Sequence, residues 1–211
     1  MTANFDSLSR PYRWLERIAF GGALERARFA HLDALSGARR VLLLGDGDGR
    51  FLEQLLRIAP EARVDSIDAS AGMLRLAEAR VTPADRARVS LQRADALTVP
   101  LRDAEYDTVV TLFFLDCFTP AETHALVQRV SSALEPRATW LFADFAIPDQ
   151  GLQRFVARLV TGGLYWFFRW QTGITAQHLP DSEREIAAAG FRATHAKSLA
   201  FGLLRSVMFR R

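Results

Sequence analysis

The chain has 211 residues, of which 49% are hydrophobic, so it is long enough for one α/β domain with a substantial core. Its net charge is +3, and its arginines are interspersed with acidic residues along the expected helices, which indicates solvated helix faces rather than a nucleic-acid patch. The sequence has no run of about 18 uncharged apolar residues and no signal-peptide core, and its single cysteine, Cys117, excludes an internal disulfide. We therefore expect a cytoplasmic protein without a transmembrane helix.

Strand-like and helix-like patterns alternate from residue 41 to residue 145. Short apolar runs are separated by stretches with helical spacing. In chain order we expect a helix at 22–35, strands at 41–44, 64–67, 89–91, 106–114 and 139–145, and helices at 50–58, 71–80 and 119–134. Ser70 and Thr119 precede two of these helices and are expected to be their N-caps. This alternation predicts a parallel sheet with helices on both faces.

The last third of the chain has a different pattern. Residues 152–160 carry a helical stripe, and residues 164–170 are apolar and aromatic almost all round. We expect a short helix at 182–189 that ends at Gly190, and two closing strands at 191–200 and 203–210 that turn near Gly202.

The run Val-Leu-Leu-Leu-Gly-Asp-Gly-Asp-Gly at residues 41–49 is the most informative local feature. Its apolar part is typical of a buried parallel strand, and Gly45, Gly47 and Gly49 predict a tight turn into a helix. Glycine allows unusual backbone conformations and lets a ligand approach the main chain closely. A loop of this kind after the first strand is where α/β proteins bind nucleotides.

Two acidic residues follow the next two strands. Asp68 ends the second strand, where a carboxylate can accept hydrogen bonds from both hydroxyls of a ribose. Just past the third strand, the Asp95 side chain can accept from an adenine amino group, and the Ala96 N–H can serve a ring nitrogen. The alternative roles are a helix cap for Asp68 and a surface turn for Asp95.

Together these residues resemble the class I S-adenosylmethionine-dependent methyltransferases, over nearly all of residues 41–145. The resemblance implies a Rossmann-like α/β fold with a seven-stranded, mostly parallel sheet of order 3-2-1-4-5-7-6, an antiparallel strand 7 and helices on both faces. It implies one domain, residues 1–211. Its expected parts are an N-terminal helical cap (1–38), a cofactor-binding core (39–145), a helical substrate-cover segment (146–190) and a terminal β-hairpin (191–211).

Residues 5–12, Phe-Asp-Ser-Leu-Ser-Arg-Pro-Tyr, together with Gly21, are similar to the segment that folds over the cofactor in the quinone C-methyltransferase branch. The resemblance implies S-adenosylmethionine as cofactor, S-adenosylhomocysteine as product and no metal. The implied cofactor contacts are Tyr12, Gly45, Asp46, Gly47, Asp48, Gly49, Asp68, Ala69, Met73, Asp95, Ala96, Leu112 and Phe113.

The chain departs from the family pattern at Leu43, where the family usually has an acidic residue two positions before the first glycine. Asp46 and Asp48 stand inside the loop instead. Because the cofactor carries an ammonium and a sulfonium, we hypothesise that one of these carboxylates replaces the missing charge. The alternative is that both are solvent-facing turn formers.

Methyl transfer depends mainly on holding nucleophile, methyl carbon and sulfur in line, so the sequence need not contain a catalytic constellation. The candidates for a general base are His178 and two acids beyond the carboxyl ends of the fourth and fifth strands, Asp116 and Asp144. For each acid, the alternative is a structural hydrogen-bond acceptor at a strand end.

The segment after the fifth strand commonly helps to cover the acceptor site in this fold. We therefore expect Phe145, Tyr165 and Trp166 to contact the substrate. The aromatic stretch has three interpretations: ordinary core or dimer contact, the lining of a pocket for a flat or greasy acceptor, and peripheral membrane contact through 155–170.

The sequence thus predicts a methyltransferase that acts on a small, apolar or aromatic acceptor, as a monomer or homodimer without a nucleic-acid partner. One rival is a non-catalytic cofactor-binding or partner-binding protein on the same fold. The other is a nicotinamide oxidoreductase, which the bulky Arg50 disfavours because a dinucleotide fingerprint needs a small residue there.

Overall fold

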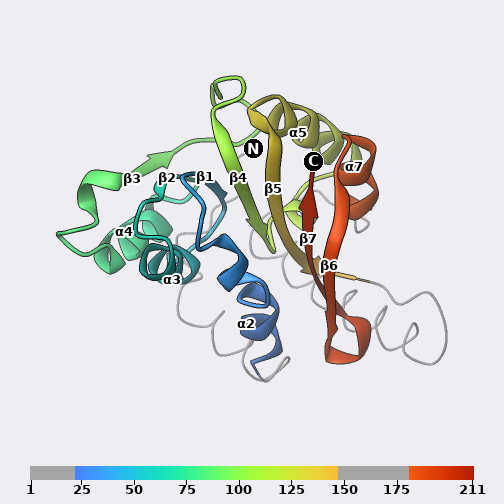
Figure 1. The fold of residues 1–211 in the computed structure, drawn as a ribbon, viewed down its shortest axis with the longest axis horizontal. Helices are drawn as coiled ribbons and strands as arrows, with labels where there is room; N and C mark the ends of the chain where they lie inside the picture. Colours follow the sequence, from blue (N-terminus) through green and yellow to red (C-terminus); the bar gives the residue numbers. More distant parts are fainter. Residues whose placement is uncertain (1–21, 147–180) are drawn as a thin grey trace.

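A central sheet organises the computed structural model, which describes residues 22–146 and 181–211. Within these residues the sheet has seven strands in the order β3-β2-β1-β4-β5-β7-β6 (Figure 1). The strands are β1 (Arg40–Leu44), β2 (Arg63–Asp68), β3 (Val89–Arg93), β4 (Tyr106–Leu112), β5 (Leu134–Phe145), β6 (Arg192–Leu199) and β7 (Leu204–Arg210). β1 to β5 pair in parallel, whereas β7 is antiparallel to both β5 and β6. The predicted fold class and strand order are confirmed.

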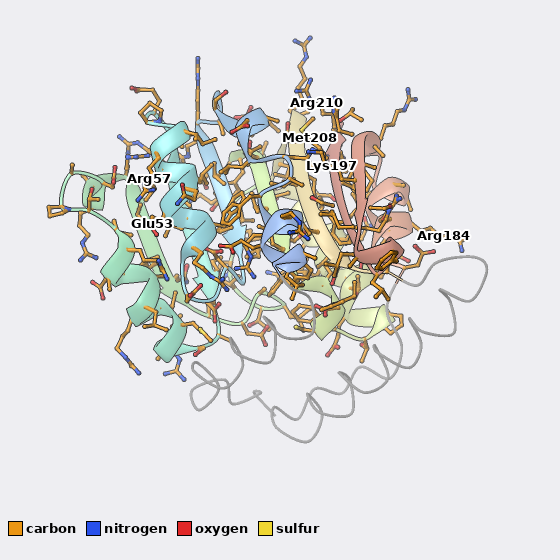
Figure 2. All side chains as sticks on the ribbon, turned by 90° about the horizontal axis from the view of Figure 1, so that it is seen from below. Glu53, Arg57, Arg184, Lys197, Met208 and Arg210 are labelled. Carbon is orange, nitrogen blue, oxygen red and sulfur yellow. The ribbon has the colours of Figure 1, made fainter. Side chains whose placement is uncertain are left out.

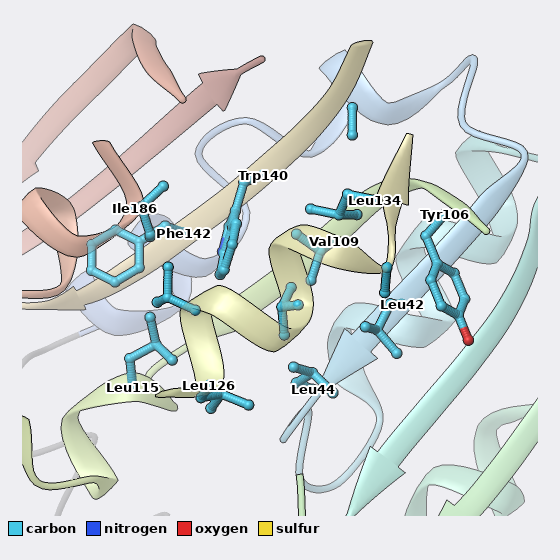
Figure 3. Packing of buried hydrophobic residues seen from close by; sticks show 14 of the residues in the cluster. Leu42, Leu44, Tyr106, Val109, Leu115, Leu126, Leu134, Trp140, Phe142 and Ile186 are labelled. Carbon is cyan, nitrogen blue, oxygen red and sulfur yellow. The ribbon is translucent and has the colours of Figure 1, made fainter. Parts of the chain in front are cut away.

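Helices lie on both faces of this sheet (Figure 1). They are α2 (Ala23–Arg28), α3 (Arg50–Ile58), α4 (Ala71–Arg80), α5 (Pro120–Ser132) and α7 (Ser182–Ala188). Alternate residues of β1 face opposite layers, as the two-residue period of a strand requires. Val41 and Leu43 pack in the layer of α3, while Leu42 and Leu44 pack in the layer that contains Leu126 of α5 (Figure 3).

Two predicted helix starts are confirmed by their capping bonds. The Ser70 side chain accepts a hydrogen bond from the Met73 N–H at 3.2 Å. At α5, Thr119 and Glu122 form a reciprocal capping box, and Pro120 opens the helix.

Three predicted boundaries around β4 and β5 are wrong by a few residues. β4 ends at Leu112 rather than 114, because Phe113 takes a left-handed φ of 54°. α5 ends at Ser132 and β5 already begins at Leu134, which pairs with Tyr106. Long-range strand pairing here outweighs the local helical spacing.

The predicted helix at 22–35 is interrupted. α2 ends at Arg28, and a separate 3-10 helix covers Leu32–Leu35. The interruption lies against the C-terminal hairpin: His31 Nε2 is 3.2 Å from the Ser206 carbonyl oxygen, and Lys197 Nζ donates to the Ala30 carbonyl at 3.0 Å. These contacts hold the end of α2 against the β6–β7 hairpin.

On α3, an arginine forms an ion pair with a glutamate of the preceding turn. Glu53 and Arg57 lie beside each other on this helix (Figure 2), with Arg57 Nη2 and Glu53 Oε1 2.7 Å apart. Such i,i+4 pairs support an exposed helix face. None of the helices within residues 22–146 and 181–211 is long and apolar enough to cross a membrane.

Candidate active site

The three loop glycines after β1 differ in what an added side chain would meet. All have positive φ, 67° at Gly45, 66° at Gly47 and 79° at Gly49. A Cβ on Gly45 would lie 2.2 Å from the Phe114 ring, and one on Gly49 would lie 2.5 Å from the Ala77 Cα in α4. Among residues 22–146 and 181–211, a Cβ on Gly47 would meet nothing nearer than the Met73 sulfur at 3.9 Å. Gly49 therefore lets the loop pack on α4, whereas the main chain at Gly47 is open to a ligand.

Asp68 ties this loop to the end of β2. Its Oδ2 accepts from the Gly47 N–H at 3.2 Å, and its Oδ1 accepts from the Ser70 N–H at 2.8 Å. Burial raises the pKa of Asp68, although these two hydrogen bonds oppose the shift. Each carboxylate oxygen retains acceptor capacity, so the residue can hold the loop and still bind hydroxyl groups.

The end of β3 lies next to Asp68. The Ala94 N–H donates to the Asp68 carbonyl at 3.2 Å. Asp95 is exposed, and its Oδ1 accepts from the Leu97 N–H at 2.9 Å, which closes a turn. Ala96 is 7% exposed, and its carbonyl accepts from Arg129. The predicted ribose and adenine residues therefore meet at one edge of the sheet.

Asp46 caps the helix that follows the loop. Its carboxylate accepts from the N–H groups of Phe51 at 3.3 Å and Leu52 at 2.9 Å. Burial raises the pKa of Asp46 to about 6, although the charge of Arg28 and these hydrogen bonds favour the ionised form. Both oxygens of this carboxylate are thus engaged at the start of α3.

Asp48 binds two arginines. Its Oδ1 lies 3.0 Å from Arg50 Nε, and its Oδ2 lies 3.3 Å from Arg80 Nη2. Although burial opposes ionisation, the charges of Arg50 and Arg80 hold the pKa of Asp48 below its ordinary value. Neither Asp46 nor Asp48 is a solvent-facing turn former, and a contact of either residue with the cofactor stays a prediction.

Asp116 and Asp144 come together at the carboxyl ends of β4 and β5. Asp144 is 2% exposed, and its two oxygens accept from the N–H groups of Asp116 at 3.0 Å and Phe145 at 2.9 Å. Burial and then the neighbouring Asp116 charge raise the pKa of Asp144 well above its ordinary value. Burial also raises the pKa of Asp116, to about 6. These acids are among the strongly perturbed groups that often mark functional sites.

Two aromatic side chains at the same edge of the sheet pack against α2. Phe113, in its left-handed conformation, has its ring 5.5 Å from that of Phe145. Arg28 of α2 lies over the Phe113 ring, with its Cζ 5.8 Å from the ring centroid. A non-glycine residue at positive φ stores backbone strain, which is commonly found at functional sites.

The structure locates most of the predicted site residues along one edge of the sheet. Leu112 is 4% exposed and packs in the layer of α3, so its side chain belongs to the core. Ala69 is exposed and Met73 half-buried beside Gly47. Four predictions lie outside the described residues: Tyr12, Tyr165, Trp166 and His178, as does the segment 155–170.

Two residues of this region could not be found from the sequence. Arg28 is one arginine among many, and it reaches Phe113 and Asp46 only because α2 packs on β7. Phe114 covers Gly45 because the chain reverses after β4. Within residues 22–146 and 181–211, no group of three or more His, Cys, Asp or Glu side chains could hold a metal ion.

Comparisons with known proteins agree with this geometry. Residues 41–137 match the family model of a methyltransferase domain. The chain is 29% identical over 195 residues to the ubiquinone/menaquinone biosynthesis C-methyltransferase UbiE of Syntrophotalea carbinolica, covering 88% of this chain and 79% of the relative.

Two solved structures share the fold. The S-adenosylmethionine-dependent methyltransferase SibL in its apo form matches with a TM-score of 0.69 at 20% identity, over 100% of this chain, which spans 62% of the SibL chain. The Burkholderia thailandensis 1,6-didemethyltoxoflavin-N1-methyltransferase, with 1,6-didemethyltoxoflavin and S-adenosylhomocysteine bound, matches with a TM-score of 0.65 at 17% identity. That match covers 98% of this chain and 85% of the neighbour.

The strand order, the glycine loop and the family match are those of a class I S-adenosylmethionine-dependent methyltransferase. Within this class, the chain is similar to the quinone C-methyltransferase branch that UbiE represents.

Proposed function

We propose that the protein transfers a methyl group from S-adenosylmethionine to a small hydroxylated aromatic acceptor of the reduced-quinone type. The observation that carries the cofactor part is the link between the open main chain at Gly47 and the carboxylate of Asp68. When bound, the cofactor supplies an electrophilic methyl group on a positively charged sulfur.

The residues at the carboxyl edge fit such a cofactor. Asp68 would accept from the ribose hydroxyls, and Asp95 with the Ala96 N–H would bind the adenine ring. Two acids, Asp68 at the end of β2 and Asp116 just after β4, lie at this edge of the sheet, so negative charge gathers there. A cation is favoured in such a place.

The acceptor part depends on two other considerations. The relative UbiE is named as a C-methyltransferase of ubiquinone/menaquinone biosynthesis, and the Burkholderia neighbour holds 1,6-didemethyltoxoflavin. In this chain, the rings of Phe113 and Phe145 pack against each other where β4 and β5 end. Flat rings pack well on aromatic faces in offset or edge-on arrangements. We propose that residues 146–190, including Tyr165 and Trp166, cover this acceptor and that residues 1–38, including Tyr12, cover the cofactor.

Calorimetric titration with S-adenosylhomocysteine tests the cofactor site. Asp68→Asn keeps an acceptor oxygen for the loop but loses the charge, so each lost charged hydrogen bond should cost roughly 1.5–3 kcal/mol, or about 10- to 150-fold in affinity. Asp65→Asn is the matched control, because Asp65 lies on the same strand and accepts from the Tyr106 hydroxyl. Equal affinities of the wild type and Asp68→Asn would refute the proposed site.

Turnover tests the acceptor. We expect the protein to convert S-adenosylmethionine to S-adenosylhomocysteine when 1,4-naphthohydroquinone is supplied, and not when the oxidised naphthoquinone is supplied. Cofactor binding without turnover of hydroquinones or simple phenols would retain the cofactor site and overturn the acceptor class.

A further inference from the structure

Asp116 and Asp144 form a pair with unequal access to solvent. Asp144 lies near the end of β5 and is 2% exposed, whereas Asp116 lies in the 3-10 turn Leu115–Cys117 after β4 and is half-buried. The backbone N–H of Asp116 donates to Asp144 Oδ2 at 3.0 Å, which brings the two acids together. Two carboxyl groups held close together in a buried place do not both ionise readily, so we expect the pair to hold a single proton near neutral pH.

Burial determines which residue holds this proton. Asp144 is the more deeply buried acid, so its charged form is the more costly, and the pKa of Asp144 is raised furthest. With the proton on Asp144, Asp116 remains a carboxylate at neutral pH, since burial raises its pKa only to about 6. The two groups titrate as a coupled pair, of which the accessible member is the base.

The pair lies on the same edge as the cofactor residues. Among the described residues, the titratable groups that act on Asp116 are Asp144 and Cys117. The Cys117 Sγ lies 3.6 Å from Asp116 Oδ1. The turn that carries both residues lies against the glycine loop, because a Cβ added on Gly45 would be 2.2 Å from the Phe114 ring.

We propose that this pair is the proton acceptor of the methyl transfer, with Asp116 as the catalytic base and Asp144 as its positioning residue. The proposal rests on the proposed function, and it defines the acceptor as a molecule whose reacting position must lose a proton, such as a hydroquinone. In the net reaction the acceptor atom gains the methyl carbon, the electron pair of the broken carbon–sulfur bond stays on sulfur, and the acceptor proton moves to Asp116.

The first test needs no acceptor. At pH 6, S-adenosylmethionine and S-adenosylhomocysteine are each titrated into the full chain, in two buffers with different ionisation enthalpies, to count the protons released. Because only S-adenosylmethionine carries a sulfonium charge, it should favour ionised Asp116 and release up to about half a proton more than S-adenosylhomocysteine. Asp116→Asn should abolish this difference while its S-adenosylhomocysteine affinity stays within about twofold of wild type.

The outcomes separate this proposal from the proposed function. If neither ligand binds the wild type, both fail. If both ligands bind and release equal numbers of protons, or if Asp116→Asn keeps the difference, the pair is not the base and only this inference fails.

The second test uses 1,4-naphthohydroquinone as acceptor. The kcat of the wild type should rise with pH through a midpoint near 6, whereas Asp116→Asn should be slower by about 100- to 10,000-fold with no such midpoint. Asp144→Asn should move the midpoint, because it removes the shared proton, and a merely structural role would lower kcat without moving it. An unchanged pH profile in both variants would overturn the assignment.

Discussion

A single added methyl group should mainly lower stability at one loop glycine and mainly weaken ligand binding at another, two residues away. In Gly49→Ala the new Cβ would lie 2.5 Å from the Ala77 Cα and 2.7 Å from its Cβ, where neither α4 nor the loop can move freely. Overpacking of this kind costs about 1–3 kcal/mol, and alanine in the left-handed region costs about 1–2 kcal/mol. We therefore expect the free energy of unfolding to fall by about 2–5 kcal/mol.

Gly47→Ala is the matched variant. It has the same backbone cost, but its Cβ would have 3.9 Å of clearance from the Met73 sulfur, so its free energy of unfolding should fall by only about 1–2 kcal/mol. Its S-adenosylhomocysteine affinity should fall more than that of Gly49→Ala, because the methyl group projects into the open side of the loop. Gly37→Ala, with nothing within 4 Å of the new Cβ, should change neither quantity.

Urea unfolding and calorimetric binding measure the two effects separately. For an m-value of about 2 kcal/mol per M, the unfolding midpoint of Gly49→Ala should lie about 0.5–1.5 M below that of Gly47→Ala. If the two midpoints coincide, the close packing of the loop on α4 is not what requires glycine at position 49. If Gly47→Ala binds like the wild type, the open main chain is not a ligand site.

Other predictions concern single groups. The pKa of Asp46 is raised to about 6 in the folded state, so between about pH 4 and 6 the folded chain binds more protons than the unfolded chain. The wild type should therefore lose stability relative to Asp46→Asn as pH rises from about 4 to 6. A constant difference in the free energy of unfolding between the two proteins across this range, measured with denaturant, would contradict this. Thr119→Ala removes the capping box and should lower the free energy of unfolding by about 1 kcal/mol without changing cofactor affinity, as urea unfolding and calorimetry would report. Burial, followed by the neighbouring Asp116 and Asp144, raises the pKa of the Cys117 thiol. Iodoacetamide at pH 8 should therefore alkylate Cys117 readily only in the unfolded chain, and rapid labelling of the native protein would contradict this expectation.

The sheet could be predicted because its information is local. β1 is a buried apolar run that ends at glycines, β2 is followed by α4 with its Ser70 cap, and β5 is preceded by α5 with its Thr119 cap. The point at which β4 ends is different, because the left-handed Phe113 donates its N–H to the Ala143 carbonyl at 2.7 Å. That bond joins residues far apart in the sequence, and no pattern within β4 encodes it.

Part of the site could also be predicted from local information. The position of Asp68 follows from a strand end that is succeeded by a helix, and the Gly47 N–H, which donates to Asp68, joins this position to the glycine loop. Asp116 and Asp144 come together because β4 and β5 are neighbours, yet the single proton that we propose for the pair depends on burial, which spacing does not give. Arg28 depends on how α2 packs against the C-terminal hairpin, so its place over Phe113 could not be foreseen.

The last prediction concerns the acidic residue that the family usually has at the position of Leu43. Leu43 is fully buried in the layer of α3, and Asp46 is bonded to the start of that helix. If Asp46 supplied the charge that complements the sulfonium, Asp46→Asn would weaken binding of S-adenosylmethionine more than that of S-adenosylhomocysteine. Because the Asp46 carboxylate is occupied by the Phe51 and Leu52 N–H groups, we expect Asp46→Asn instead to weaken binding of both ligands equally, through a less stable loop. Asp116→Asn should reduce the preference for the charged ligand. Calorimetric affinities of both ligands for both variants decide between these roles. If Asp46→Asn selectively loses affinity for S-adenosylmethionine, Asp46 supplies the charge that the family usually has at the position of Leu43.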